Sequence, residues 1–240
     1  MLTRRDLLKI IGLASLAGDT TLVARATIPA ARDFSPANPS NSAIAQAVAR
    51  TREPLQALTA AEADLLDAIV ARLIPSDDSG PGATEARAVR YIDRGLAGAL
   101  LGSREAYRVG LAAIDRYSRS SRGSPFVALS PTDQDSVLID VETGAATGSG
   151  AGFLGSSAVF FALVRTQTIQ GTFGDPYYGG NADFVGWDLL GYPGVRTVVT
   201  PDEQRLGVTI APTHRSAYDH EMFIKASARA NGPEGPSRGD

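Results

Sequence analysis

The sequence LTAAEADLLDAIVARLIP, residues 58–75, is the stretch that decides the fold. It opens with a capping box, in which Thr59 is the N-cap residue and Glu62 follows three positions later. Pro75 ends the pattern. Between them, apolar residues recur at helical spacing: Leu65, Leu66, Ile69, Val70 and Leu73. The stretch therefore predicts an amphipathic helix whose apolar stripe belongs to a core.

Further helical patterns follow along the chain. They cover residues 83–101, 103–123, 130–143 and 156–170. Ser130 and Pro131 have the order expected of an N-cap residue and a first helical residue, and Ser103 is expected to cap the helix that it precedes. The predicted fold is mainly α, a compact helical domain of about five helices with a long loop region rich in glycine and aromatic residues. The β-forming residues at 197–199 and 208–210 also allow one short hairpin.

The N-terminus has the pattern of a twin-arginine (Tat) export signal. Arg4 and Arg5 precede a mildly apolar run at residues 10–18, and small residues allow cleavage after Ala26. The run is too short for a membrane-spanning helix, which needs about 20 residues. We therefore expect a periplasmic protein that is exported by the Tat pathway and meets the membrane only indirectly.

Changes in composition set the other boundaries. We expect a Tat signal peptide at 1–26, an extended N-terminal segment at 27–57, a helical domain at 58–195, a C-terminal extension at 196–230 and a disordered tail at 231–240.

The composition leaves few reactive side chains. Because the chain has no cysteine, it can form no disulfide, no thiolate metal site and no covalent c-type haem attachment. A net charge of -3 argues against a nucleic-acid partner. His214 and His220 lie six residues apart, which does not place them on one helical face. A stand-alone periplasmic metal-dependent enzyme that uses these histidines and nearby acids is one alternative.

Residues 150–155, GAGFLG, match the pattern of a dinucleotide-binding loop. Such a loop needs a buried strand directly before its first glycine. Here residues 144–149 are glycine, alanine, threonine and serine. A flexible loop is the preferred interpretation.

The most distinctive stretch is GTFGDPYYGGNADFVGWDLLGYPG, residues 171–194, which we call the Gly/aromatic block. It contains seven glycines, three tyrosines and the only tryptophan of the chain. Such a composition cannot form one regular helix. The aromatic residues either plug the open end of the helical bundle or form a protein–protein surface. A further alternative is a sugar-binding module, in which the aromatic rings would stack on sugar rings.

Taken together, these motifs resemble the gluconate 2-dehydrogenase subunit 3 family. The resemblance rests on the export signal, the first-helix pattern at 58–62 with the residues RLIPSDD at 72–78, FGDPYYGGN at 173–181, and Trp187 with GYPG at 191–194. It covers about residues 58–195. Members of this family are the small, or gamma, subunits of periplasmic sugar and polyol dehydrogenases.

The resemblance implies a non-catalytic role for this chain. In the family, a large FAD-bearing flavoprotein of the glucose–methanol–choline (GMC) type is the catalytic subunit, and electrons commonly pass to a multihaem cytochrome c in a third subunit. The small subunit binds the flavoprotein, supports its folding and supplies the Tat signal. We therefore expect no catalytic, cofactor-binding or metal-binding residue in this chain. The residues expected to contact the partner are Phe173, Asp175, Pro176, Tyr177, Tyr178, Gly179, Gly180, Asn181, Trp187, Tyr192 and Pro193.

Overall fold

A computed structural model describes residues 54–147 and 152–223. The predicted export signal with Arg4 and Arg5, most of the predicted extended segment and the predicted tail therefore lie outside the described residues. Among the residues that are described, no helix is both long and apolar enough to cross a membrane.

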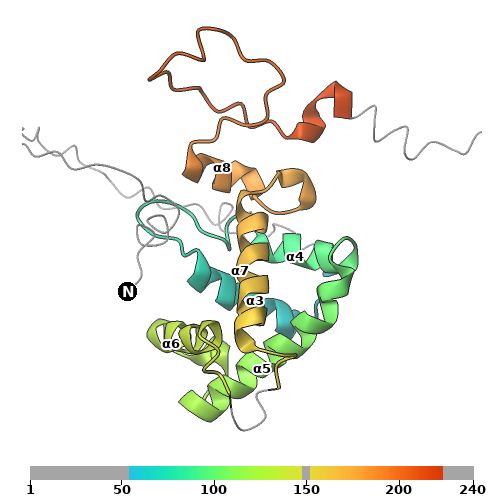
Figure 1. Cartoon of the computed structure of the whole chain (residues 1–240), viewed down its shortest axis with the longest axis vertical. Helices are drawn as coiled ribbons and strands as arrows, with labels where there is room; N and C mark the ends of the chain where they lie inside the picture. Colours follow the sequence, from blue (N-terminus) through green and yellow to red (C-terminus); the bar gives the residue numbers. More distant parts are fainter. Residues whose placement is uncertain (1–53, 148–151, 224–240) are drawn as a thin grey trace, which may run out of the picture. The chain divides into compact units, whose positions relative to one another are not determined.

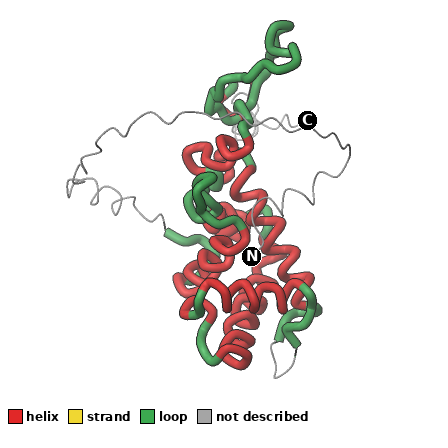
Figure 2. The backbone as a smooth tube through the Cα atoms, turned by 90° about the vertical axis from the view of Figure 1, so that its left-hand side faces the viewer, coloured by secondary structure: helices red, strands yellow, loops and turns green. Residues whose placement is uncertain are grey.

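The described part of the chain is mainly helical, as predicted (Figure 1). Its α-helices are α3 (Ala60–Leu73), α4 (Ala88–Ala97), α5 (Arg104–Arg122), α6 (Pro131–Glu142), α7 (Ser157–Phe173) and α8 (Val185–Leu190). Short 3₁₀ turns are η1 (Leu101–Ser103), η2 (Phe126–Ala128), η3 (Pro176–Tyr178), η4 (Ala182–Phe184) and η5 (Ala217–Asp219). Within the described ranges the only β pairing is an isolated bridge between Asp77 and Gly80, and Figure 2 shows helices and loops alone.

Helix α7 is the central element of the domain. It contacts α3, α4, α5, α6 and α8, and Figure 1 shows it running between them. Apolar side chains from each of the five longer helices are buried together, among them Leu66, Ile69, Ile92, Leu96, Leu111, Ile114, Val137, Val141, Phe160 and Val164. A fully buried side chain of this kind contributes about 1.5–3 kcal/mol relative to an exposed one. Packing around α7 therefore holds the bundle together.

Three predicted helix starts are confirmed by their caps. Thr59 Oγ1 accepts a hydrogen bond from Glu62 N at 3.3 Å, and the Glu62 carboxylate accepts one from Thr59 N at 2.9 Å, which completes the capping box of α3. Ser130 caps α6 and Ser156 caps α7 through their side-chain oxygens. A cap of this type is worth about 1 kcal/mol. Gly123, with φ +76°, ends α5 as its sequence suggested.

The helix predicted over 83–101 is shorter in the structure, where α4 covers only Ala88–Ala97. Residues before it form turns, and Arg87 adopts a left-handed φ of 57°, which a continuing helix cannot include. At the other end, Leu100 N donates to Gly95 O, and the chain continues into η1. Because η1 leads directly into α5, Ser103 makes no side-chain cap, contrary to the prediction.

The hairpin allowed at 197–199 and 208–210 does not form. The described chain has no strand at these residues. The two segments are joined instead at residues outside the predicted strands, where Val195 N donates to Arg215 O at 3.0 Å and Thr213 N donates to Pro193 O at 2.8 Å. Val198 is 72% exposed, so no burial favours pairing of the segments. A lone two-stranded hairpin is marginal in water.

A buried carboxylate fixes the residues that precede α3. Asp93 of α4 is fully buried and accepts hydrogen bonds from the backbone N–H groups of Gln56, Ala57 and Leu58 at 2.8–2.9 Å. Hydrogen bonds to a charged acceptor are stronger than neutral ones. The end of the predicted 27–57 segment is therefore tied to α4.

Candidate functional site

The Gly/aromatic block begins in the last turn of α7 and packs back against that helix. Asp175 starts η3, where its carboxylate accepts a hydrogen bond from Tyr177 N at 2.9 Å and Pro176 takes the first position of the turn. Further along, Asn181 N donates to Gly171 O at 2.7 Å. The block is thus fixed to the C-terminal end of the central helix.

Asn181 is the internal anchor of the block. Its side chain is fully buried, and its Nδ2 donates to Gly174 O at 2.8 Å while its Oδ1 accepts from Gly186 N at 2.8 Å. Its φ of 43° lies in the left-handed region, which asparagine tolerates better than most residues. One side chain therefore joins the end of α7 to the start of α8.

Two glycines of the block are required by packing inside the subunit. A Cβ on Gly180 would lie 2.0 Å from Gly171 O, and one on Gly186 would lie 1.9 Å from Thr172 O. No side chain fits at such distances. These glycines therefore serve the contact between the block and α7.

Trp187 belongs to the part of the Gly/aromatic block that is buried inside the subunit. It is 4% exposed, and its Nε1 donates to Phe173 O at 2.9 Å. Its ring packs against Phe184 at 5.3 Å and meets Tyr192 edge-on at 4.9 Å. Trp187, Gly180 and Asn181 lie inside the subunit, so they support the surface from beneath. Their predicted contact with a partner stays a prediction.

The outer half of the block presents tyrosines to solvent. Tyr177 is 53% exposed and Tyr178 is 49% exposed. Tyr218, from the C-terminal extension, stacks on Tyr177 with ring centres 3.7 Å apart, and its hydroxyl lies 2.7 Å from that of Tyr178. The hydrogen bond with Tyr178 raises the pKa of Tyr218 above its ordinary value. We call Tyr177, Tyr178 and Tyr218 the tyrosine cluster.

Asp175 fastens the C-terminal extension to the block. Its carboxylate accepts hydrogen bonds from Ser216 Oγ at 2.6 Å and from Ala217 N at 2.9 Å, in addition to the one from Tyr177. Ser216 and Asp219 form a capping box around η5, which carries Tyr218. Asp175 therefore positions the third member of the tyrosine cluster.

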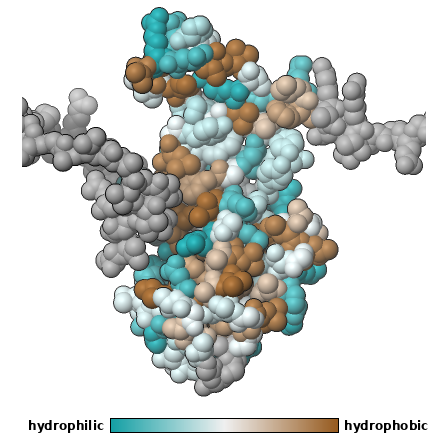
Figure 3. Space-filling view, viewed as in Figure 1, coloured by the Kyte–Doolittle hydropathy of each residue, from teal (hydrophilic) through white to brown (hydrophobic). Residues whose placement is uncertain are grey.

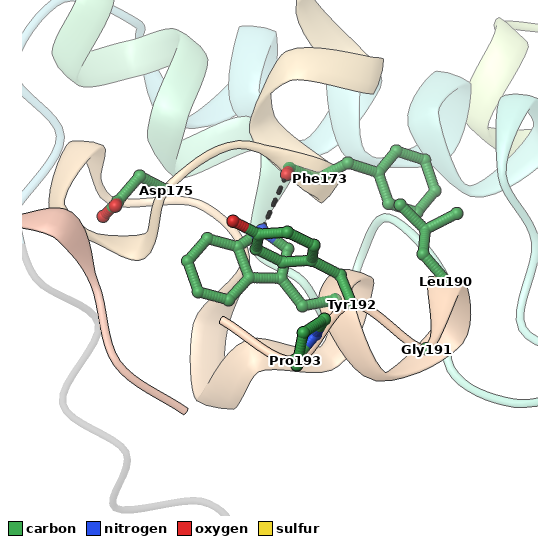
Figure 4. A pocket seen from close by; sticks show the side chains of 7 residues that line it. Phe173, Asp175, Leu190, Gly191, Tyr192 and Pro193 are labelled. Atoms are coloured by element: carbon green, nitrogen blue, oxygen red, sulfur yellow. Dashed lines mark hydrogen bonds between the residues drawn. The ribbon is translucent and has the colours of Figure 1, made fainter. Parts of the chain in front are cut away.

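A shallow, open groove of about 550 Å³ lies beside the cluster. It is lined by Phe173, Asp175, Trp187, Leu190, Gly191, Tyr192 and Pro193. Figure 4 shows Asp175 at one end and Leu190 at the other, with the Tyr192 ring between them. Its lining is mostly apolar, and its one carboxylate is already hydrogen-bonded within the subunit. The groove suits binding of an apolar or aromatic side chain.

The histidines occupy separate places. His214 Nε2 lies 2.8 Å from Asp188 Oδ1, and its ring stacks on Phe184 at 4.9 Å. His220 Nε2 lies 3.1 Å from Val195 O. Within the described ranges no group of three or more histidine, aspartate and glutamate side chains is placed to hold a metal ion. The alternative of a metal enzyme that uses both histidines gains no support from this geometry.

The residues of the dinucleotide-like pattern are described only in part, since Gly150 and Ala151 lie outside the described residues. The chain before them leaves helix α6 and forms a turn, not a strand. The context that a dinucleotide-binding loop requires is therefore missing from residues 143–147.

Residues 60–194 match the family model described as gluconate 2-dehydrogenase subunit 3. The chain belongs to the gluconate 2-dehydrogenase subunit 3 family. Comparisons with curated proteins and with solved structures found no significant match. The part of this subunit that matches the family runs from the start of α3 to the last residue of the Gly/aromatic block, so it includes the groove and two members of the tyrosine cluster.

Sequence reasoning missed the contribution of the C-terminal extension to this site. Tyr218 of the extension contacts Tyr178, 40 positions earlier, and His214 contacts Asp188 and Phe184, 26 and 30 positions earlier. The pattern Ser216-x-x-Asp219 is a capping signal that could have indicated an ordered turn around Tyr218. Nothing in the local sequence indicates which residues that turn would contact.

Proposed function

We propose that this chain is the non-catalytic small subunit of a periplasmic, flavin-dependent sugar or polyol dehydrogenase complex. It binds a catalytic subunit of the GMC type, assists its folding and assembly, and carries the Tat signal by which both are exported. Membership of the subunit 3 family supports a role as an accessory subunit of a dehydrogenase complex.

The exposed side of the Gly/aromatic block carries the proposal. Tyr177, Tyr178 and Tyr192 are 53%, 49% and 41% exposed, although they stand on a scaffold whose inner side is fully packed. Tyrosine is among the residues that dominate binding energy at protein interfaces, because it offers a rigid apolar body with a polar tip. A rigid platform of exposed tyrosines beside an apolar groove is the arrangement expected of a protein-binding face.

The redox chemistry belongs to other subunits in this proposal. FAD is bound by the catalytic partner, and haem c is bound by a multihaem cytochrome that accepts the electrons. This subunit contributes binding surface and the export signal. Its contact with the membrane is indirect, through the complex.

Co-expression tests the assembly role. The cognate flavoprotein is produced with and without this subunit, and periplasmic dehydrogenase activity and the FAD content of the purified flavoprotein are measured. We expect periplasmic activity only when this subunit is present. A large subunit that reaches the periplasm active on its own would show that the proposed role is wrong.

The role of the tyrosine cluster in binding the flavoprotein is tested by Tyr177→Ala combined with Tyr178→Ala. Loss of interface hot spots of this kind costs about 2 kcal/mol or more, so we expect the affinity for the flavoprotein to fall about 30-fold or more. Leu101→Ala is the control, since Leu101 is 57% exposed but lies in η1, outside the block. Thermal unfolding of each variant checks that the fold is intact.

Export is tested separately by Arg4→Lys combined with Arg5→Lys. If the partner has no signal of its own, both proteins should remain in the cytoplasm, as measured by fractionation and immunoblotting. Continued export of the partner would show that it travels independently of this subunit.

A further inference from the structure

The segment that follows the Gly/aromatic block forms an arm with a firmly built base. We define the arm as residues 195–215. At its base, Val195 N donates to Arg215 O at 3.0 Å. Both Thr213 N and Thr213 Oγ1 donate to Pro193 O, just before the arm, at 2.8 Å. Gly194 beneath it is buried with φ +96°, and a Cβ there would lie 2.7 Å from Thr213 Oγ1. The point at which the arm leaves the domain is therefore fixed.

The base is also held against α8. His214, within the arm, bonds Asp188 of α8 and stacks on Phe184 directly before that helix. Pro193, which accepts the bonds from Thr213, is at the same time part of the groove lining. The arm thus begins at the edge of the proposed partner-binding face.

Beyond the base, the arm exposes apolar side chains that do not pack into the core of the domain. Val198 is 72% exposed, Val199 48% and Val208 46%, while Leu206 is completely exposed. Figure 3 shows hydrophobic surface on the arm at the top of the view, and Figures 1 and 2 show the arm extending past α8. This part of the chain lies after the last residue matched by the family model, Gly194.

Much of the backbone of the arm also makes no hydrogen bond within the described structure. Between 196 and 212, the backbone hydrogen bonds lie only around the tip, where Glu203, Gln204, Arg205 and Val208 donate to carbonyls three residues back and Thr200 N donates to the Glu203 carboxylate at 2.8 Å. The residues on either side, 197–199 and 209–211, make no backbone hydrogen bond in the described structure. They are mostly valine, isoleucine and threonine, which favour strands. Two strand-forming segments are therefore present without a sheet.

The charges of the arm argue against a nucleic acid or an anionic lipid surface as its partner. The arm has three arginines and two acids, and two of the arginines form ion pairs, Arg196 with Glu203 and Arg205 with Asp202, so the arm exceeds balance by only one positive charge, that of Arg215 at its base. A polymer of phosphates or an anionic lipid surface would require an excess of basic residues. An extended segment with free N–H and C=O groups and exposed β-branched side chains fits the edge of a sheet in another protein.

We propose that the arm adds a strand to an exposed sheet edge of the dehydrogenase catalytic subunit, using residues 197–199 or 209–211. The inference rests on the proposed function, because it takes its partner from it. Main-chain hydrogen bonds to the partner's edge strand supply the binding, and the valine side chains select the register. The tyrosine cluster and the arm then form two adjoining parts of one interface.

Hydrogen–deuterium exchange of the mature subunit, alone and in the co-purified complex, tests the arm directly. In the isolated subunit the amides of 197–199 and 209–211 should exchange at the shortest labelling time, since they are unbonded. In the complex, the amides of one of these segments should exchange about tenfold or more slowly. Unchanged exchange in a complex that does form would overturn the arm proposal while leaving the proposed function intact.

Proline substitutions test whether the contact is a strand pairing. Adjacent residues of a strand direct their N–H groups to opposite sides, and proline has no N–H. If residues 197–199 supply the strand, either Val198→Pro or Val199→Pro should reduce co-purification of the flavoprotein by about tenfold, and the other should reduce it much less. Val198→Thr and Val199→Thr are matched controls that keep the N–H and the β-branch. If 209–211 are the protected segment, Thr209→Pro and Ile210→Pro replace this pair.

Three outcomes overturn the proposal. Equal effects of the two neighbouring prolines would indicate docking of side chains without strand pairing. Protection of the arm in the isolated subunit that grows with protein concentration would assign it to a second copy of this chain. If wild-type subunit and flavoprotein fail to co-purify at all, the proposed function itself fails, and the arm proposal fails with it.

Discussion

Replacement of Asn181 by alanine gives the sharpest test of how the proposed partner-binding face is supported. Asn181 is completely buried, and its amide spans from Gly174 O to Gly186 N with two hydrogen bonds of 2.8 Å. Alanine removes both. It also places a residue with no local hydrogen bond at φ 43°, a left-handed conformation that alanine disfavours.

The expected cost can be added from these parts. An unsatisfied buried N–H at Gly186 costs about 1–3 kcal/mol, and the lost bond to Gly174 O costs about 1 kcal/mol. The left-handed backbone adds about 1 kcal/mol for alanine. The free energy of unfolding should therefore fall by about 3–5 kcal/mol, a large part of the 5–15 kcal/mol typical of a domain.

Urea unfolding of the subunit without residues 1–26, followed by circular dichroism, measures this change. With an unchanged slope, the midpoint should fall by about 1–2 M. Asn181→Gly is the matched control, because glycine accepts the backbone conformation but makes neither bond, and it should be about 1 kcal/mol more stable than the alanine variant. A loss below about 1 kcal/mol for Asn181→Ala would refute the reasoning. Equal stability of the two variants would show that backbone strain contributes nothing.

Three further predictions concern neighbouring features. The hydrogen bond from Arg196, and to a smaller extent those from Thr200, lower the pKa of Glu203 from 4.5 to about 2. The stability that these bonds contribute is therefore present above pH 4.5 and is lost as the pH falls toward 2. Arg196→Gln should raise the pKa of Glu203 toward 4.5, as measured by an NMR titration. Gly186→Ala should destabilise the subunit by about 3 kcal/mol, whereas Gly191→Ala, with φ +65° and no atom within 4 Å of the added Cβ, should cost about 1 kcal/mol in the same urea assay. Sugars should leave the fluorescence of Trp187 unchanged in the isolated chain, and a saturable change would favour the sugar-binding alternative.

Helix positions were predictable where the signals were local. The caps at Thr59, Ser130 and Ser156 and the end of α5 at Gly123 depend on residues within a few positions of each other, and the structure confirms all four. The start of α4 was not predictable in this way. Apolar spacing continues back to residue 83, but the left-handed φ of Arg87 breaks the helix, and the preceding carbonyl, Ala86 O, accepts a hydrogen bond from Ala182 N, 96 positions away, which no local pattern indicates.

The proposed partner-binding face was predictable in composition but not in organisation. The sequence alone showed that residues 171–194 combine glycines with aromatic residues, and it left a core plug and an interface as alternatives. In the structure one part of the block, with Asn181 and Trp187, is buried inside the subunit, and another, with Tyr177 and Tyr178, is exposed; that the exposed part binds a partner stays a proposal. Which residue belongs to which part depends on contacts such as that of Tyr178 with Tyr218, 40 positions apart, which no local pattern encodes.

The division of the block changes what its glycines imply about partner binding. If glycines made room for a partner's backbone, substituting them would weaken binding and leave the subunit stable. Gly180 and Gly186 instead lie against carbonyl oxygens of α7, so their substitution should unfold the block first and affect binding only as a consequence. If the proposed function holds, selectivity for a particular dehydrogenase rests on the exposed tyrosines. Because Tyr218 stacks on Tyr177 from outside the family-matched residues, changes in the C-terminal extension can alter that selectivity without changing the block itself.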